Sequence, residues 1–243
     1  MSSEVERRPY LENYTGKNVR VAIIDSGVHA AHPHVDGIDC GFAIADDGTV
    51  TDDCIDRLGH GTAVAAAVRE KAPQARLIAV KIFRDRLATN IDTLCAAIQL
   101  AAERGAQVIN LSLGTNQPQH RARLEEVVAA AADRGAILVA ANDDAGARWF
   151  PGSLDGVVAV RADWTIDRHR YAIESVEGRE LILASPYPRD IPGVPREKNV
   201  HGVSFAVANA SGFAARALEA HPGARLEHVY ALLREAACAA PIA

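Results

Sequence analysis

Five short apolar runs alternate with helical patterns along the chain, and this alternation constrains the fold more than any other feature. The runs are rich in Val, Ile and Ala and have no polar face, which is typical of strands buried on both sides of a parallel sheet. They occupy residues 19–25, 76–83, 106–113, 136–142 and 156–162. The helical patterns lie at residues 61–71, 90–105 and 120–135. The sequence therefore predicts an α/β fold, a mostly parallel central sheet with helices on both faces.

The composition favours one domain and argues against two classes of partner. With 243 residues, of which 49% are hydrophobic, the chain is long enough to bury a sizeable core. A net charge of -5 and the lack of a basic run with interleaved aromatic residues argue against nucleic-acid binding. No apolar stretch is long enough to span a membrane, and the start of the chain has no apolar core of a secretory signal. We therefore expect a cytoplasmic protein without nucleic-acid or membrane partners.

Neither the cysteines nor a cluster of histidines has the spacing of a metal site. Cys40, Cys54, Cys95 and Cys238 form no C-x-x-C pair, so we expect free thiols, with a bridge between Cys40 and Cys54 left open for an exported protein. Histidines 29, 32 and 34 have no acidic or thiolate companions, which favours an ordinary loop. The acidic stretch 46–56 lacks the ligand spacing of an EF-hand and is interpreted as a solvated loop. We expect no cofactor; calcium is left open but is not expected.

Ser204 stands on a glycine-led turn at the start of a predicted helix, in the stretch "HGVSFAVANASG". Its hydroxyl has two interpretations. It can cap the unpaired N–H groups of the helix, or it can act as a nucleophile if a neighbouring base takes its proton. The second interpretation requires a histidine, a group that orients it, and donors for an oxyanion.

The rest of the chain supplies these groups. Asp25 and Asn142 end two of the predicted strands, and His60 opens a helix on a glycine-flanked turn. Catalytic groups in parallel sheets collect at the carboxyl ends of the strands. Ser204 would attack a carbonyl, His60 would transfer the proton, Asp25 would orient the imidazole and Asn142 would donate to the oxyanion. The chain order Asp, His, Ser is that of subtilisin.

Five segments resemble, in order and at comparable spacing, the signature blocks of the subtilisin-like serine proteases, or subtilases. They read "AIIDSGVHAAHP", "GHGTAVAAAV", "VINLSLG", "VAAN" and "GVSFAVANASG". The resemblance implies a single subtilisin-like peptidase domain over residues 1–243, with residues 1–18 as an N-terminal extension. It also implies a serine endopeptidase with the triad Asp25, His60 and Ser204 and the oxyanion donor Asn142.

The chain departs from the family pattern at two places, around Ser204 and just before Asn142. The family's Gly-Thr-Ser-Met-Ala-x-Pro-His reads Gly-Val-Ser-Phe-Ala-Val-Ala-Asn over residues 202–209, and Ala141 replaces a glycine before Asn142. A pseudoprotease that serves as a peptide-binding or scaffolding module therefore remains the alternative. A nucleotide-binding domain is a weaker one, because the G-x-G-x-x-G fingerprint is missing.

The resemblance also implies where a substrate lies. An extended peptide would pair with the segment Ser112, Leu113 and Gly114, and Ala140 and Ala141 would wall the primary pocket. Trp149 falls where many relatives have a glycine at the pocket floor. An inward indole would favour a small P1 residue, whereas an indole turned to the core or to solvent would leave the pocket open. Asp56, four residues before His60, suggests a basic P2 residue.

Two lengths suggest the biological setting. The N-terminal extension is too short for the folded propeptide of secreted relatives, and the calcium loop that interrupts the His60 helix in many of them is missing. We expect limited proteolysis, such as maturation of a peptide or precursor protein, with a regulatory or docking protein as a candidate partner.

Overall fold

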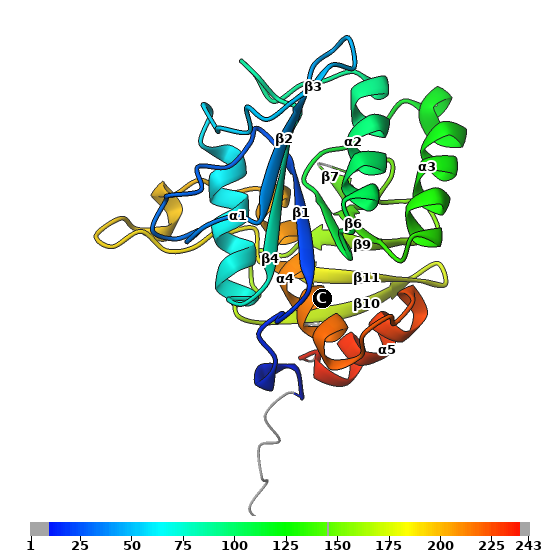
Figure 1. Cartoon of the computed structure of the whole chain (residues 1–243). Coiled ribbons are helices and arrows are strands. Elements are labelled where there is room, and N and C mark those ends of the chain that lie inside the picture. Colours follow the sequence, from blue (N-terminus) through cyan, green and yellow to red (C-terminus); the bar gives the residue numbers. More distant parts are fainter. Residues whose placement is uncertain (1–9, 145, 239–243) are drawn as a thin grey trace, which may run out of the picture.

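A nine-stranded sheet forms the centre of the computed structural model, which describes residues 10–144 and 146–238 (Figure 1). Its strands are β1 (Arg20–Asp25), β2 (Cys40–Ile44), β3 (Val50–Thr51), β4 (Arg76–Lys81), β5 (Val108–Leu111), β6 (Ile137–Ala141), β9 (Val157–Ala162), β10 (Tyr171–Val176) and β11 (Arg179–Ala184). The spatial order is β10-β11-β9-β6-β5-β1-β4-β2-β3. All neighbours pair in parallel except β10 with β11 and β2 with β3. The predicted mostly parallel sheet is confirmed.

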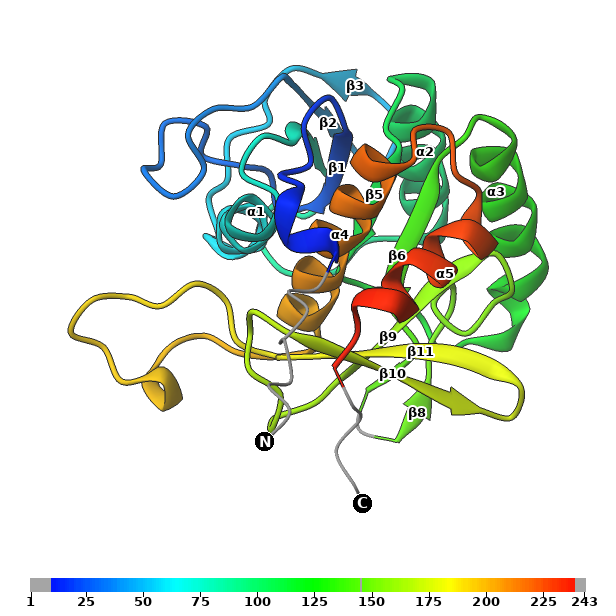
Figure 2. The ribbon, with the colours of Figure 1, turned by 90° about the horizontal axis from the view of Figure 1, so that it is seen from below.

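Helices cover both faces of this sheet, as predicted. They are α1 (His60–Lys71), α2 (Ile91–Glu103), α3 (Arg121–Asp133), α4 (Val203–Ala220) and α5 (Leu226–Ala236), with short 3-10 turns η1 (Tyr10–Asn13), η2 (Pro118–His120) and η3 (Arg196–Lys198). One core lies between the sheet and α1, α4 and α5, and a second lies between the sheet and α2 and α3 (Figures 1 and 2). None of the helices in the described part of the chain is long and apolar enough to span a bilayer.

The central strand β1 shows why the runs are apolar on both faces. Val21 and Ile23 belong to the first core, whereas Ala22 and Ile24 belong to the second. All four side chains are completely buried. Because successive residues of a strand point to opposite faces, a strand covered by helices on both sides needs an apolar side chain at every position.

The antiparallel pairs β10–β11 and β2–β3, at the two edges of the sheet, and a small separate ribbon were not predicted. The edge hairpin of β10 and β11 turns at Glu177 and Gly178, which both have positive φ, and β7 (Asp143–Asp144) pairs with β8 (Ala147–Arg148). Polar residues interrupt these segments because they lie at the margin of the fold, so their pattern does not resemble that of a buried strand.

The N-terminal extension is partly tied to the rest of the chain. Residues 1–9 lie outside the described part, but the N–H groups of Thr15, Gly16 and Lys17 donate to the carboxylate of Glu219 on α4 at 2.5, 2.6 and 3.0 Å. The side chain of Glu219 thus anchors the segment that leads into β1.

Helices α1 and α4 cross closely at Gly212. A Cβ atom at Gly212 would lie 2.4 Å from the Cβ of Lys71 and 3.2 Å from the carbonyl oxygen of Val68. The Lys71 side chain is only 2% exposed and its Nζ donates to Glu70 at 2.5 Å. The helices can therefore approach this closely only because residue 212 has no side chain.

We expect Gly212→Ala to destabilise the protein. Alanine favours a helix over glycine by about 1 kcal/mol, but overpacking a core costs about 1–3 kcal/mol, and this contact involves a Cβ close to the backbone. Thermal unfolding should show a fall in Tm of about 2–4 °C per kcal/mol lost. An unchanged or higher Tm would show that α1 and α4 separate without cost.

Candidate active site

The carboxyl ends of β1 and β5 meet the N-termini of α1 and α4 at one edge of the sheet. Asp25 is the last residue of β1, His60 the first of α1, and Ser204 the second of α4. Ser112 directly follows β5 and contacts the start of α4. Three of the four predicted catalytic residues are therefore brought together from distant parts of the sequence.

Asp25 and His60 form a hydrogen-bonded pair. Nδ1 of His60 lies 2.8 Å from Oδ1 and 3.0 Å from Oδ2 of Asp25, whose side chain is completely buried. The close approach depends on Gly61, because a Cβ there would lie 2.2 Å from the carbonyl oxygen of Gly27 and 3.1 Å from the Cβ of Asp25. With Nδ1 engaged by the carboxylate, Nε2 is the ring nitrogen left for proton transfer.

The environment of His60 changes its basicity. Burial disfavours the imidazolium, but the hydrogen bond and charge of Asp25, together with the charge of Asp56, outweigh it and raise the pKa of His60 above the ordinary 6.5. This shift suits a base that must accept a proton from a hydroxyl.

Asp56 holds the turn that leads into α1. Its carboxylate accepts hydrogen bonds from the hydroxyls of Ser26 and Thr62 at 2.9 and 2.6 Å, and from the N–H groups of Leu58, Gly59 and Thr62, each at 2.9 Å. Burial raises the pKa of Asp56, but these hydrogen bonds outweigh it and hold the pKa below its usual range. Asp56 thereby positions the N-terminus of α1, a role that sequence reasoning missed. Its contact with a P2 residue stays a prediction.

Ser204 does not cap its helix. The N-cap is Gly202, whose φ of 151° favours glycine, and no side chain caps α4. The Ser204 hydroxyl donates to the carbonyl oxygen of Ser112 at 3.3 Å, and among the described residues it makes no hydrogen bond with His60. Proton transfer to His60 therefore requires rotation of the hydroxyl, as is common in enzymes without bound substrate.

A buried polar chain fixes the start of α4. Ser211 donates to Oδ1 of Asn110 at 3.0 Å, Nδ2 of Asn110 donates to the hydroxyl of Ser112 at 3.0 Å, and that hydroxyl donates to the carbonyl oxygen of Ser204 at 3.2 Å. Asn110 and Ser211 are completely buried. Sequence reasoning missed both, although a polar residue inside the apolar run of β5 was a signal.

Asn142 directly follows β6, and both Nδ2 and Oδ1 of its carboxamide are hydrogen-bonded. Nδ2 donates to Oδ2 of Asp143 at 2.7 Å, and Oδ1 accepts from Arg179 at 3.4 Å. Arg161 in turn donates to Oδ2 of Asp143 at 2.9 Å. Because Nδ2 carries two hydrogens, one remains for an oxyanion.

A cleft of about 660 Å³ contains His60 and Ser204. The predicted substrate segment, Ser112 to Gly114, lies along it, and it also contains apolar residues that sequence reasoning missed, Phe83, Leu87, Ile91 and Leu94. Ala140 and Ala141 are buried within β6, at 0% and 3% exposure, and belong to the two cores.

Trp149 also lies in this cleft. Paired hydrogen bonds of 2.8 and 2.9 Å between Thr115 and Phe150 hold the two segments side by side, and a Cβ at Gly114 would lie 2.9 Å from Cε3 of the indole. The indole of Trp149 therefore borders Gly114 within the cleft, and its filling of the P1 pocket stays a prediction.

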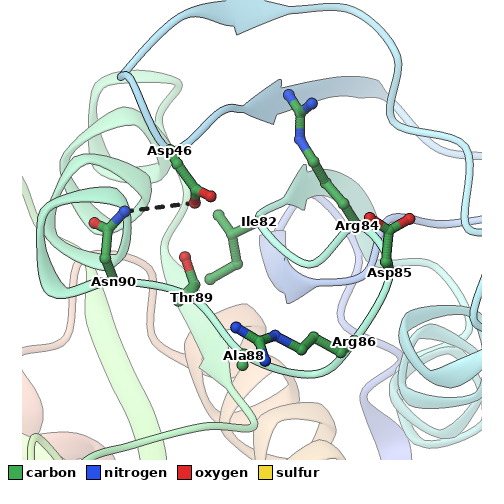
Figure 3. Close-up of a pocket in the computed structure, with 8 residues that line it drawn as sticks. All are labelled: Asp46, Ile82, Arg84, Asp85, Arg86, Ala88, Thr89 and Asn90. Carbon is green, nitrogen blue, oxygen red and sulfur yellow. Dashed lines mark hydrogen bonds between the residues drawn. The ribbon is translucent and has the colours of Figure 1, made fainter.

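A separate polar pocket of about 450 Å³ lies behind the loop between β4 and α2 (Figure 3). Asn90 contacts Asp46 there at 3.4 Å, while Arg84 and Arg86 extend in different directions. These cations do not converge on one point, so the pocket resembles a solvated junction more than a binding site.

Comparison with known proteins agrees with this geometry. The profile of the Subtilase family matches residues 16–167, and subtilisin Savinase of Lederbergia lenta is 30% identical over 222 residues, which cover 86% of this chain and 79% of that protein. The chain belongs to the subtilase family. A solved cold-adapted subtilisin-like serine proteinase shares the fold, with a TM-score of 0.71, 21% identity and coverage of 91% and 83% of the two chains. The prenylagaramide maturation protease PagA gives a TM-score of 0.63 and 26% identity, over 86% of this chain and 78% of that one.

This membership makes the chain a serine endopeptidase of the subtilisin type. The resemblance that five sequence segments indicated is therefore confirmed, as is the fold that it implied.

We expect the activity of this subtilase to fall as the pH drops, because His60 must be neutral to accept a proton. Since the pKa of His60 is raised, the midpoint of the acid limb of kcat/KM should lie above 6.5. Asp56→Asn removes one of the charges that raise it and should lower the midpoint, whereas Asp53→Asn, at an exposed carboxylate paired with Arg57, should leave it unchanged. A wild-type midpoint at or below 6.5 would contradict this assignment.

Proposed function

We propose that this subtilase carries out limited proteolysis of a peptide or precursor protein with the triad Asp25, His60 and Ser204 and the oxyanion donor Asn142. The observation that carries the proposal is the Asp25–His60 hydrogen bond of 2.8 Å at the rim of the cleft that also contains Ser204. No other function considered requires a buried carboxylate to hold a histidine beside a serine at a helix start.

The residues perform acyl transfer in two stages. The Ser204 hydroxyl leaves the Ser112 carbonyl, gives its proton to Nε2 of His60 and attacks the substrate carbonyl. The imidazolium, stabilised by Asp25, then returns the proton to the leaving amine, so the acyl group stays on Ser204. Water repeats the sequence and releases the acid. Asn142 donates its free N–H to the oxyanion in both stages.

Limited rather than general proteolysis is supported by the shape of the cleft. A peptide paired with Ser112 to Gly114 presents its P1 side chain toward Trp149, whose ring lies against Gly114. The indole fills volume that a large P1 residue needs, which favours Gly, Ala or Ser. Similarity to a maturation protease, PagA, fits a role in processing, and a docking or regulatory protein would supply further selectivity.

We assign no metal a part in this function. Triad chemistry requires none, and residues 10–144 and 146–238 contain no group of three His, Cys, Asp or Glu side chains placed to hold an ion. Helix α1 runs from His60 to Lys71 without a break, and β4 begins at Arg76.

A pseudoprotease is the second candidate, and two hydrogen bonds favour it. The Ser204 hydroxyl is bonded to Ser112, and the Asn142 amide is bonded to Asp143, so neither group is aligned for catalysis without substrate. A peptide-binding module would keep the cleft, and Ser204 and Asn142 would keep these hydrogen bonds when a peptide binds.

Labelling with a fluorophosphonate probe separates the two candidates. Wild type should be labelled and should cleave a peptide library, while Ser204→Ala should lose both properties and keep its Tm. Asn142→Ala should lower kcat by roughly 10²–10³, the magnitude measured for the oxyanion asparagine of subtilisin, a relative. Folded wild type that resists labelling would support the pseudoprotease.

Trp149→Gly should change the P1 preference. Wild type is expected to cleave after Gly, Ala or Ser, and the variant should also cleave after Phe or Leu, because removal of the indole opens volume beside Gly114. Trp164→Gly is the matched control, since that tryptophan is 52% exposed and packs on Tyr187 away from the cleft. Efficient cleavage after Phe or Leu by wild type would show that the indole leaves the pocket open.

A further inference from the structure

A second cavity, of about 400 Å³, lies beside the catalytic residues and is not used by the mechanism above. Its apolar lining residues are Ala63 and Ala66 from α1 and Pro188, Ile191 and Val200 from the loop between β11 and α4. Ile191 and Val200 remain 46% and 58% exposed. Apolar side chains left this open at the edge of a cavity indicate a contact surface.

The cavity and the substrate cleft are lined by residues that are close neighbours along the chain. The cleft includes His60, Val203 and Ser204, and the cavity includes Gly59 and Thr62 on one wall and Asn199 and Val200 on the other. The two hollows therefore border the same helix start and the same segment before Ser204. If the part of a peptide before the cleaved bond lies along Ser112 to Gly114, the part after that bond extends toward the cavity. This second part is the one that leaves with the proton from His60.

The loop that forms one wall is held in place. It projects from the body beside α1 (Figures 1 and 2), and the buried Asn209 of α4 donates to the carbonyl oxygens of Ser185 and Tyr187 at 3.0 and 3.1 Å. Farther along, Nδ2 of Asn199 donates to the carbonyl oxygen of Arg189 at 3.1 Å. These bonds give the wall a defined shape before any ligand arrives.

The polar groups of the cavity are mainly basic. His29, His32 and His34 line it, and so does Arg189. Arg189 lies near enough to His34 that, after burial, its charge is the next cause that lowers the pKa of His34. The cavity's carboxylate, Asp56, already accepts hydrogen bonds from five donors of its own turn.

The guanidinium of Arg189 has no acceptor among the residues that the structure describes. Nearby Arg168 differs, because it is paired with both Glu70 and Asp190. A guanidinium has five N–H donors and binds a carboxylate through two parallel hydrogen bonds. An unpaired arginine beside three imidazoles is therefore complementary to an acidic side chain.

We propose that this cavity binds the leaving segment of the substrate and selects an acidic residue within the first three positions after the cleaved bond. Arg189 binds its carboxylate, the imidazoles of His32 and His34 add donors, and Ile191 and Val200 cover an apolar neighbour. The proposal rests on the proposed proteolysis for its direction along the peptide. An extended peptide advances about 3.3 Å per residue, so three residues span roughly 10 Å from the reacting bond.

The first test compares peptides that are identical except for Glu or Gln at the second position after the cleaved bond. Wild type should cleave the Glu peptide with kcat/KM about tenfold higher, the size expected of a charge-assisted hydrogen bond. Arg189→Gln should reduce this ratio to near one, mainly by lowering kcat/KM for the Glu peptide, and Arg189→Lys should restore part of it. Arg196→Gln is the matched control, because Arg196 stands on the same loop but lies over the ring of Tyr187 at 4.5 Å and should keep the full ratio.

A second measurement separates this proposal from the proposed function. Fluorescent peptides that contain only the leaving segment, with Glu or Gln at the same position, are titrated against the Ser204→Ala variant. The Glu peptide should bind about tenfold more tightly, and Arg189→Gln should abolish the difference even if wild type proves unable to hydrolyse any peptide. Equal binding of the two peptides, or a Glu preference that survives Arg189→Gln, would overturn the proposal.

Discussion

The close contact between the end of β1 and the start of α1 is the constraint on which the site depends. Asp25 is buried at the carboxyl end of a central strand, where an unpaired carboxylate would be costly, and the imidazole of His60 hydrogen-bonds it at 2.8 Å. The contact is possible because Gly61 has no side chain to meet the carbonyl oxygen of Gly27. Asp56 then fixes the turn before His60 through the hydroxyl of Ser26 and the N–H groups of the turn. One short strand and one helix start thus determine the position of His60, the proposed catalytic base.

Ser204 and Asn142 form the second half of the site, and other elements support them. Ser204 is placed by Gly202 at the N-cap and by the polar chain that runs from Ser211 through Asn110 to Ser112. Asn142, the proposed oxyanion donor, is placed independently, by Asp143 and Arg179. Because these supports arise from different elements, the proposed base, nucleophile and oxyanion donor are positioned separately.

Patterns of burial made most of the fold predictable. Strands such as β1, with Val21 and Ile23 on one face and Ala22 and Ile24 on the other, are covered on both sides and so carry an unbroken apolar signal. The hairpin of β10 and β11 lies at the edge of the sheet, where alternating polar residues such as Glu174 and Glu180 weaken that signal. The candidate catalytic residues could be proposed from the sequence because strand ends and helix starts are marked in it, and their roles stay predictions. The direction of Trp149 and the partners of Asp56 could not be predicted, since both depend on contacts between segments that are distant along the chain.

The central claim is that Ser204, activated by the Asp25–His60 pair, forms a covalent acyl intermediate. The most direct measurement is rapid-mixing kinetics with an activated ester, followed by peptide mapping of the acid-quenched protein. We predict an initial burst of one leaving group per chain and an acyl group on Ser204. A linear time course without a burst, together with no acyl group on Ser204 in the quenched protein, would contradict the account.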